Sequence, residues 1–195
     1  MESAKMITYK EVDSSYFEMY DTVSMNVEMN SIYKISRIDN GLGGMVFEEI
    51  PCERVIKDLS VFEHATDYEK MFDITNWRFY MAFDGDKPVG AMTIAGRTEG
   101  MNMLGGRTDA CVLWDIRVSD EYKHQGIGKN LLKMGITNAG NDGYSQMIIE
   151  CQSNNVTACK FYAGMGAKLS KIDMYAYYME PDVKDDVMLV WYLDL

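Results

Sequence analysis

Short apolar runs separated by glycine-rich and acidic turns follow one another along the chain, which predicts a mixed α/β domain without a linker or internal repeat. Alternation predicts strands at 5–12, 32–38, 45–50, 78–83, 89–95, 111–118, 146–152, 172–179 and 187–193. Helical spacing predicts helices at 14–29, 126–139 and 155–165, with Ser14 or Ser15 capping the first, and helical or irregular structure over 52–75. The order from 111 to 165 is that of a β-α-β-α unit in which a crossover joins two parallel strands.

A glycine pair opens the predicted helix at 126–139, directly after an apolar strand and a charged turn. A helix start presents unpaired backbone N–H groups and the positive end of its dipole, so phosphate oxygens can bind there without a metal. The spacing excludes a dinucleotide fingerprint, which would need glycine at Leu131. It also excludes a P-loop, which would need glycine at Lys123 and Ser or Thr at Asn130.

Two motifs in this half of the chain resemble those of one enzyme family. Lys123, two further residues and the Gly-Ile-Gly of 126–128 are similar to the Arg/Gln-x-x-Gly-x-Gly/Ala pyrophosphate loop of the GCN5-related N-acetyltransferases (GNAT), with lysine in place of Arg or Gln. The run NVTACKFYAGMG at 155–166 resembles the family's Asn-x-x-Ala-x-x-aromatic-Tyr-x-x-x-Gly signature. The likeness extends from about Trp77 to the end of the chain, and 149–178 is particularly similar to streptothricin (nourseothricin) acetyltransferases.

This resemblance implies an α/β (α+β) GNAT acyl-CoA N-acyltransferase fold with acetyl-CoA as cofactor. A central mixed, mostly antiparallel twisted sheet would be flanked by helices and would splay into a V between its fourth and fifth core strands. One domain would cover 1–195, with a variable acceptor-site half at 1–76 and an acetyl-CoA-binding core at 77–195. The implied cofactor-binding residues are Ile116, Arg117, Val118, Lys123, His124, Gln125, Gly126, Ile127, Gly128, Lys129, Asn155 and Tyr162.

Acyl transfer from a thioester to an amine needs a neutral amine and a thiolate that can leave. A lysine-like ammonium with a pKa of about 10.4 loses its proton at a cost of roughly 4.6 kcal/mol at pH 7, so removing that proton is the larger task. The resemblance implies that Tyr162 protonates the leaving thiol. Its spacing also fits a core position on the stripe of Ala158, Phe161 and Met165, and Asn155 could be a plain helix N-cap.

Two carboxylates are candidates for the base. Asp115 interrupts an otherwise apolar strand, and Glu150 lies on the next strand. Each could instead be a salt-bridge partner, for instance of Arg117 or Arg107. In the streptothricin-modifying relatives a glutamate aligns one place earlier, with Trp114.

The net charge and the cysteine content limit which kinds of ligand and partner this protein can have. A net charge of −11, from 30 acidic and 19 basic residues, disfavours nucleic acid and attracts a cationic small molecule. Four cysteines (Cys52, Cys111, Cys151 and Cys159) and two histidines show no metal-ligand spacing, so we expect reduced thiols and no metal. No apolar run of about twenty residues and no leader-like N-terminus is present, which predicts a cytoplasmic protein without a membrane partner.

The sequence therefore predicts an acetyl-CoA-dependent N-acetyltransferase, monomeric or homodimeric, that acetylates an amine of a small cationic substrate by direct attack in a ternary complex. A streptothricin-like, aminoglycoside-type antibiotic is the candidate substrate. Two alternatives stay open at this point: acetylation of a protein or peptide amine, and a non-catalytic acyl-CoA-binding sensor module.

Overall fold

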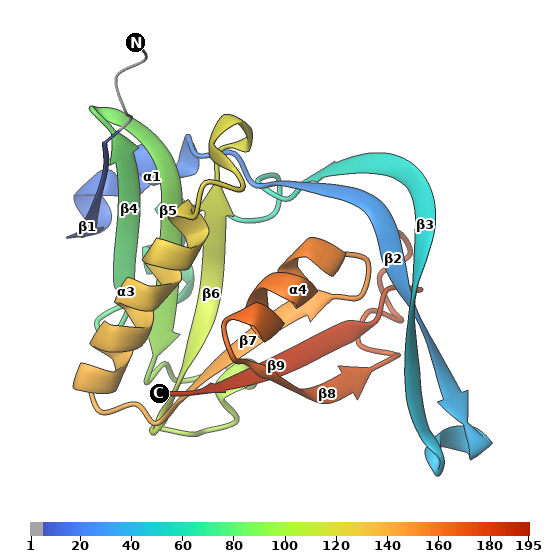
Figure 1. Ribbon diagram of the computed structural model, residues 1–195. Coiled ribbons are helices and arrows are strands. Elements are labelled where there is room, and N and C mark those ends of the chain that lie inside the picture. Colours follow the sequence, from blue (N-terminus) through green and yellow to red (C-terminus); the bar gives the residue numbers. More distant parts are fainter. Residues whose placement is uncertain (1–5) are drawn as a thin grey trace. The chain divides into compact units, whose positions relative to one another are not determined.

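The computed structural model describes residues 6–195, so Lys5 at the start of the first predicted strand lies outside the described residues. The chain divides into two compact units (Figure 1). The first unit contains Asp58–Ile148 together with the residues up to Asn26 and the last two residues. The second contains Val27–Lys57 and Ile149–Leu193.

The first unit is built on antiparallel strands that lie in the order β1-β4-β5-β6. Their bounds are β1 (Ile7–Val12), β4 (Arg78–Asp84), β5 (Lys87–Gly96) and β6 (Ala110–Val118). Strand β7 (Gln146–Gln152) comes next in the order and continues into the second unit. The alternation of apolar and polar residues predicts all of these strands, with small differences at their ends.

Helix α3 (Ile127–Asn141) covers one face of this sheet, as the helical spacing predicts. Two glycines let the helix come close to β5. A Cβ atom at Gly90 would lie 2.9 Å from the Ile127 side chain, and one at Gly135 would lie 2.6 Å from that of Ile94. Because neither position has room for a side chain, the helix rests directly on the strand.

Helices α1 (Phe17–Asp21) and α2 (Tyr68–Met71) belong to the opposite side of the first-unit sheet. Side chains alternate between the two faces of a strand, and α3 contacts Ile94 whereas the Tyr20 hydroxyl of α1 bonds to Thr93. Aromatic rings fill this side in a chain of contacts with centroids 4.7–6.3 Å apart, formed by Phe17, Tyr68, Phe72, Trp77, Phe79 and Trp114. These contacts fix the short helices on the sheet although neither is long enough to be stable alone.

The first predicted helix is wrong beyond Asp21. Strand β2 begins at Asn26, within the range assigned to that helix. The carboxylate of Asp13, and not either of the two serines, caps the initial turn by accepting a hydrogen bond from the Ser15 amide at 3.0 Å. Residues 27–30 alternate between apolar and polar, a period-two pattern that strand pairing satisfies and a helix does not.

The predicted hairpin is confirmed, and it is longer than expected. β2 (Asn26–Ile38) pairs with β3 (Gly44–Asp58) as a separate two-stranded sheet. Its turn uses left-handed backbone at Asn40 (φ 57°) and Gly41 (φ 103°), conformations that these residue types tolerate. The expectation of helical or irregular structure is wrong for 52–58, because the extra length of β2 gives these residues a partner strand.

The rest of the second unit has the strand order β7-β9-β8, with α4 (Val156–Gly164) after β7 as predicted. β8 (Lys168–Asp173) runs antiparallel to β9 (Met188–Asp194). The predicted strand at 172–179 is wrong beyond Asp173, whose carboxylate accepts from the Tyr175 amide at 3.0 Å and so begins a turn.

Short 3₁₀ turns join these elements. They are Ser14–Tyr16, Asp39–Gly41, Ala65–Asp67, Asn102–Leu104 and Asp120–Tyr122. Within residues 6–195, no helix has the length and apolar character that crossing a bilayer requires. The α/β class expected from the sequence is confirmed.

Candidate active site

A strand, a loop and a helix start form the first part of the candidate site, all within the first unit. β6 ends at Val118, and the loop before α3 is shaped by left-handed backbone at His124 (φ 60°) and Gly126 (φ 83°). The Asn130 amide donates to the Gly126 carbonyl at 3.0 Å. The N–H groups of 127–129 lie before this hydrogen bond, in the first turn, where N–H groups have no carbonyl of the same helix to bond. The positive end of the α3 dipole therefore lies at the predicted residues His124, Gln125, Gly126, Ile127, Gly128 and Lys129.

The two long side chains at the start of this loop hold it in place. The Lys123 ammonium donates to the Asn26 carbonyl at 2.6 Å and pairs with the Asp120 carboxylate at 2.5 Å. The Gln125 amide donates to the Glu121 carbonyl at 2.9 Å. Because Asp120 already balances the charge of Lys123, an anion at this loop would be bound chiefly by backbone N–H groups. The cofactor contacts of Lys123 and Gln125 stay predictions.

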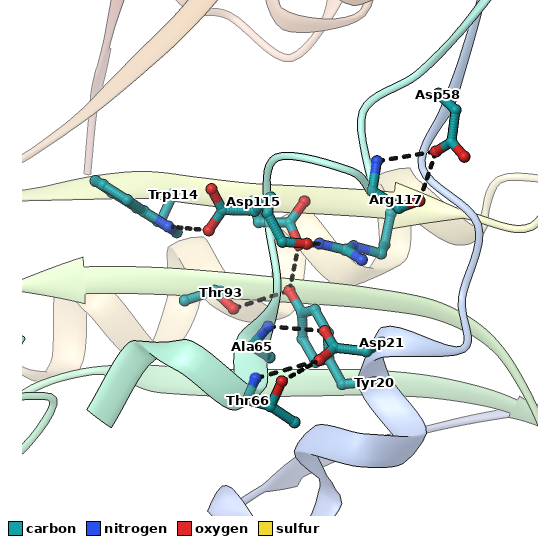
Figure 2. A network of polar contacts seen from close by, with 11 residues as sticks. Tyr20, Asp21, Asp58, Ala65, Thr66, Thr93, Trp114, Asp115 and Arg117 are labelled. Carbon is teal, nitrogen blue, oxygen red and sulfur yellow. Dashed lines mark hydrogen bonds and ion pairs between the residues drawn. The ribbon is translucent and has the colours of Figure 1, made fainter. Parts of the chain in front are cut away.

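Strand β6 carries a buried ion pair at its centre (Figure 2). The Asp115 carboxylate accepts from the Arg117 guanidinium at 2.7 Å and from the Tyr20 hydroxyl at 2.8 Å. Both charged side chains are fully shielded from solvent. Of the two arginines considered as salt-bridge partners of Asp115, Arg117 forms the ion pair. Arg107 pairs with Asp109 at 2.7 Å.

Burial shapes the electrostatics of this pair. Loss of solvent raises the pKa of the Asp115 carboxyl, while the charge and hydrogen bonds of Arg117 and the Tyr20 hydroxyl oppose the rise. Asp115 Oδ1, Arg117 Nη1 and the Tyr68 hydroxyl are buried, and none has a hydrogen-bond partner within the described part of the chain. Such polar atoms are costly to leave unpaired, so these three atoms leave the polar network incomplete.

Removing the Tyr20 hydroxyl tests how much this network contributes to stability. We expect Tyr20→Phe to lower the free energy of unfolding by about 1.5–3 kcal/mol, because the buried Asp115 carboxylate loses a donor. Urea denaturation followed by circular dichroism measures the loss. Tyr16→Phe is the control, since the Tyr16 hydroxyl contacts the exposed Lys10 ammonium, and we expect a change within about 0.5 kcal/mol. Equal losses in both variants would contradict the assignment.

A β-bulge sets the direction of the residue before Asp115. Thr93 pairs with Asp115 and Ile94 with Leu113, so Trp114 is an extra residue without a partner on β5. Its ring packs 5.3 Å from Phe72, centroid to centroid, and its indole N–H donates to the Glu63 carboxylate at 2.7 Å. The bulge therefore brings Trp114 to the face of the sheet that α1 and α2 cover.

Glu63 and Trp114 line a pocket of about 50 Å³. The side chains around it are Phe62, Glu63, His64, Asp67, Tyr68, Met71, Phe72 and Trp114. Burial raises the pKa of the Glu63 carboxyl above that of an ordinary glutamate, and the hydrogen bond from Trp114 opposes this. Glu63 could not be found from the sequence, because its partner Trp114 lies 51 residues along the chain and no local pattern marks it.

The second unit carries the remaining predicted residues. Glu150 on β7 accepts a hydrogen bond from the Tyr177 hydroxyl at 2.6 Å. Asn155 is the N-cap of α4, and its side-chain oxygen accepts from the Ala158 amide at 3.0 Å, so the capping alternative holds. Tyr162 is buried on α4 and lies 5.4 Å from the ring of Phe161, centroid to centroid.

The buried face of α4 differs from the predicted stripe. Val156, Cys159 and Tyr162 are the buried residues of the helix, so Tyr162 shares its face with Cys159. The Cys159 sulfur lies 3.5 Å from that of Cys151. Within residues 6–195, no group of three histidine, cysteine or carboxylate side chains is placed to hold a metal ion.

Sequence comparison places these features in a known family. The model of the acetyltransferase (GNAT) family matches residues 47–167, which is more than half of the chain. A streptothricin acetyltransferase of Escherichia coli is 30% identical over 84 residues, which are 43% of this chain and 48% of that protein. Streptothricin acetyltransferase A of Bacillus subtilis is 30% identical over 78 residues, or 40% and 44%. The chain thus matches just under half the length of each of these relatives.

Solved structures with a similar fold cover nearly the whole chain. A Bacillus anthracis protein in complex with acetyl coenzyme A superposes with a TM-score of 0.76 and 20% identity over 99% of both chains. A nourseothricin acetyltransferase superposes with a TM-score of 0.73 and 18% identity over 96% of this chain and 98% of that one. These likenesses confirm the expected fold, and together with the match of the family model they identify this chain as a member of the acetyltransferase (GNAT) family.

Proposed function

We propose that this protein transfers the acetyl group of acetyl-CoA to an amine of a small cationic molecule, with a streptothricin-type antibiotic as the candidate acceptor. The observation that carries the proposal is the loop before α3, where left-handed His124 and Gly126 open the helix start of a GNAT-family chain. The names of the E. coli and B. subtilis relatives support the acceptor class. The net charge of −11 favours an approaching cation.

The first unit supplies the groups that would hold the cofactor. Backbone N–H groups at the start of α3 suit the pyrophosphate oxygens, because they lie at the positive end of the helix dipole. The backbone of β6 from Ile116 to Val118 suits the amides of the pantetheine arm, which would add to the strand by ordinary β-type hydrogen bonds. The side chain of Arg117 has a different task, since it neutralises Asp115.

In the proposed reaction the amine nitrogen attacks the acetyl carbonyl carbon, and the carbon–sulfur bond breaks. The nitrogen loses one proton, and the leaving thiolate gains one. Tyr162 is our candidate for the proton donor to sulfur, since it is the tyrosine of the family motif and is buried on α4. Asp115 and Glu150 stay candidates for drawing the proton from the amine. Both already accept hydrogen bonds from tyrosine hydroxyls, which could carry that proton.

Cofactor binding gives the direct test. At a concentration 100 times its Kd, acetyl-CoA should stabilise the protein by about 2.7 kcal/mol, which raises the Tm of a chain of this size by roughly 5–10 °C. Pantetheine, which lacks the pyrophosphate, should stabilise it much less. Thiol release from acetyl-CoA is then followed with streptothricin and a panel of amines. Absence of the Tm shift would overturn the cofactor assignment, and a shift without thiol release would favour a non-catalytic sensor.

A further inference from the structure

The pocket beside Trp114 combines a carboxylate with aromatic walls. Glu63 accepts a hydrogen bond from the Trp114 indole, and within the described part of the chain it forms no ion pair. The other carboxylate of the pocket, that of Asp67, pairs with Lys70 at 2.6 Å. Phe62, Tyr68, Phe72 and Trp114 line the same pocket. A carboxylate without an ion-pair partner beside aromatic rings attracts an alkylammonium ion by charge, hydrogen bonding and cation–π contact.

A buried hydroxyl points to a ligand at the same place. Tyr68 lines the pocket and is 1% exposed, yet its hydroxyl has no hydrogen-bond partner in the described structure. The hydroxyl is close enough to Glu63 and Asp115 for each charge to act on it, and both raise its pKa after the larger effect of burial. The Glu63 carboxylate interacts with this phenol without a well-formed hydrogen bond, so a bound donor or acceptor would complete its pairing.

The volume of the pocket limits what can enter. One water-sized group needs about 10–15 Å³, so about 50 Å³ admits about three to five such groups. That is room for a terminal ammonium with two or three methylene groups. A sugar ring or a whole antibiotic does not fit, so only the end of an aliphatic chain enters.

We propose that this pocket binds the primary aliphatic ammonium of the acceptor, with Glu63 as its counter-ion and the rings of Tyr68, Phe72 and Trp114 as its walls. That this ammonium belongs to the acceptor rests on the proposed function, whereas the binding site itself does not. The location fits that role, because Trp114 immediately precedes the stretch of β6 where we place the pantetheine arm. Apart from Trp114, the residues that line this ammonium site lie in 62–72, within the part of the chain that the sequence left least defined.

A binding titration without cofactor tests the site. n-Propylammonium chloride is added to the protein at pH 7.5, and the indole N–H signal of Trp114 is followed by NMR, with the signal assigned from Trp114→Phe. We expect saturable shifts with a Kd of about 1 mM, the affinity of a small cation held by a few contacts. 1-Propanol, which has the same shape without the charge, should shift the signal at least about tenfold less effectively.

Two glutamate variants separate charge recognition from general structure. Glu63→Gln should weaken n-propylammonium binding at least about tenfold, whereas Glu69→Gln, on the exposed side of α2, should leave it unchanged. Equal response to 1-propanol in the wild-type protein, or undiminished binding by Glu63→Gln, overturns the proposal. If Glu63→Gln does not fold, the comparison of the two wild-type ligands still decides.

A second titration compares an ammonium from a small molecule with one from a protein. 1,4-Diaminobutane represents a small cationic molecule, and an unstructured lysine peptide represents a protein. If the diamine binds as tightly as the peptide or tighter, the result supports a small-molecule acceptor. If the peptide binds more than tenfold tighter than the diamine, the small-molecule part of the proposal is overturned. These titrations omit acetyl-CoA, so they can succeed or fail independently of the Tm shift that tests the proposed function.

Discussion

Arg117→Ala is expected to lower the free energy of unfolding by about 3–5 kcal/mol, because it leaves the Asp115 carboxylate buried without its counter-ion. For a chain of this length, this corresponds to a fall in Tm of roughly 6–20 °C. Urea denaturation at neutral pH measures the loss. The matched control is Arg54→Ala, because Arg54 forms an exposed ion pair with Glu28, and we expect it to cost no more than about 1 kcal/mol.

A double variant tests whether the unpaired charge of Asp115 causes the loss of stability in Arg117→Ala. Asp115→Asn and Arg117→Met together remove both charges while keeping similar volumes, so we expect the pair to be more stable than Arg117→Ala alone. If the double variant loses as much stability as the single variants Asp115→Asn and Arg117→Met added together, the residues act independently and the ion pair is not what stabilises β6.

This ion pair also shows what the sequence of β6 could and could not reveal. A charged residue inside an apolar strand marks a buried partner or a reacting group, and the Asp-Ile-Arg spacing places both charges on one face of a strand. Tyr20 lies 95 residues from Asp115, and nothing in its surroundings announces that contact. The sequence therefore defined the alternatives for Asp115, and only the structure supplied its second partner, Tyr20.

The glycine loop was the most predictable part of the candidate site. The glycine pair predicted a helix start here, and the loop that leads into it has left-handed backbone at His124 and Gly126, a conformation that glycine tolerates best. The Lys123 side chain, by contrast, is not free to bind phosphate alone. Its ammonium is held by Asp120 and by the Asn26 carbonyl, and the latter contact spans 97 residues.

The front third of the chain was the least predictable, for two physical reasons. Its strands β2 and β3 pair with each other as a separate two-stranded sheet, so neither shows the strong apolar run of a central strand. The pocket around Glu63 depends on the bulge at Trp114, and a bulge is a property of two paired strands. Neither feature can be seen in one segment considered alone.

Tyr162→Phe carries the largest expected effect on catalysis. We expect kcat to fall about 100-fold, the lower range for loss of a positioned proton donor, while the Kd for acetyl-CoA stays within about twofold. The ring of Tyr162 is buried on α4, and phenylalanine keeps that packing while it removes the hydroxyl alone. Turnover is followed by thiol release and cofactor affinity by calorimetry.

A structural role for the same hydroxyl predicts a different pattern, so the controls must separate the two. Loss of packing or of a structural hydrogen bond would lower the Tm and weaken acetyl-CoA binding together with turnover. Tyr192→Phe removes a hydroxyl from β9 in the same unit and should leave kcat unchanged. If Tyr162→Phe retains full turnover, Tyr162 is not the acid. If its turnover falls only in proportion to its Tm, Tyr162 serves the core, as its place beside Cys159 on the buried face of α4 would equally allow.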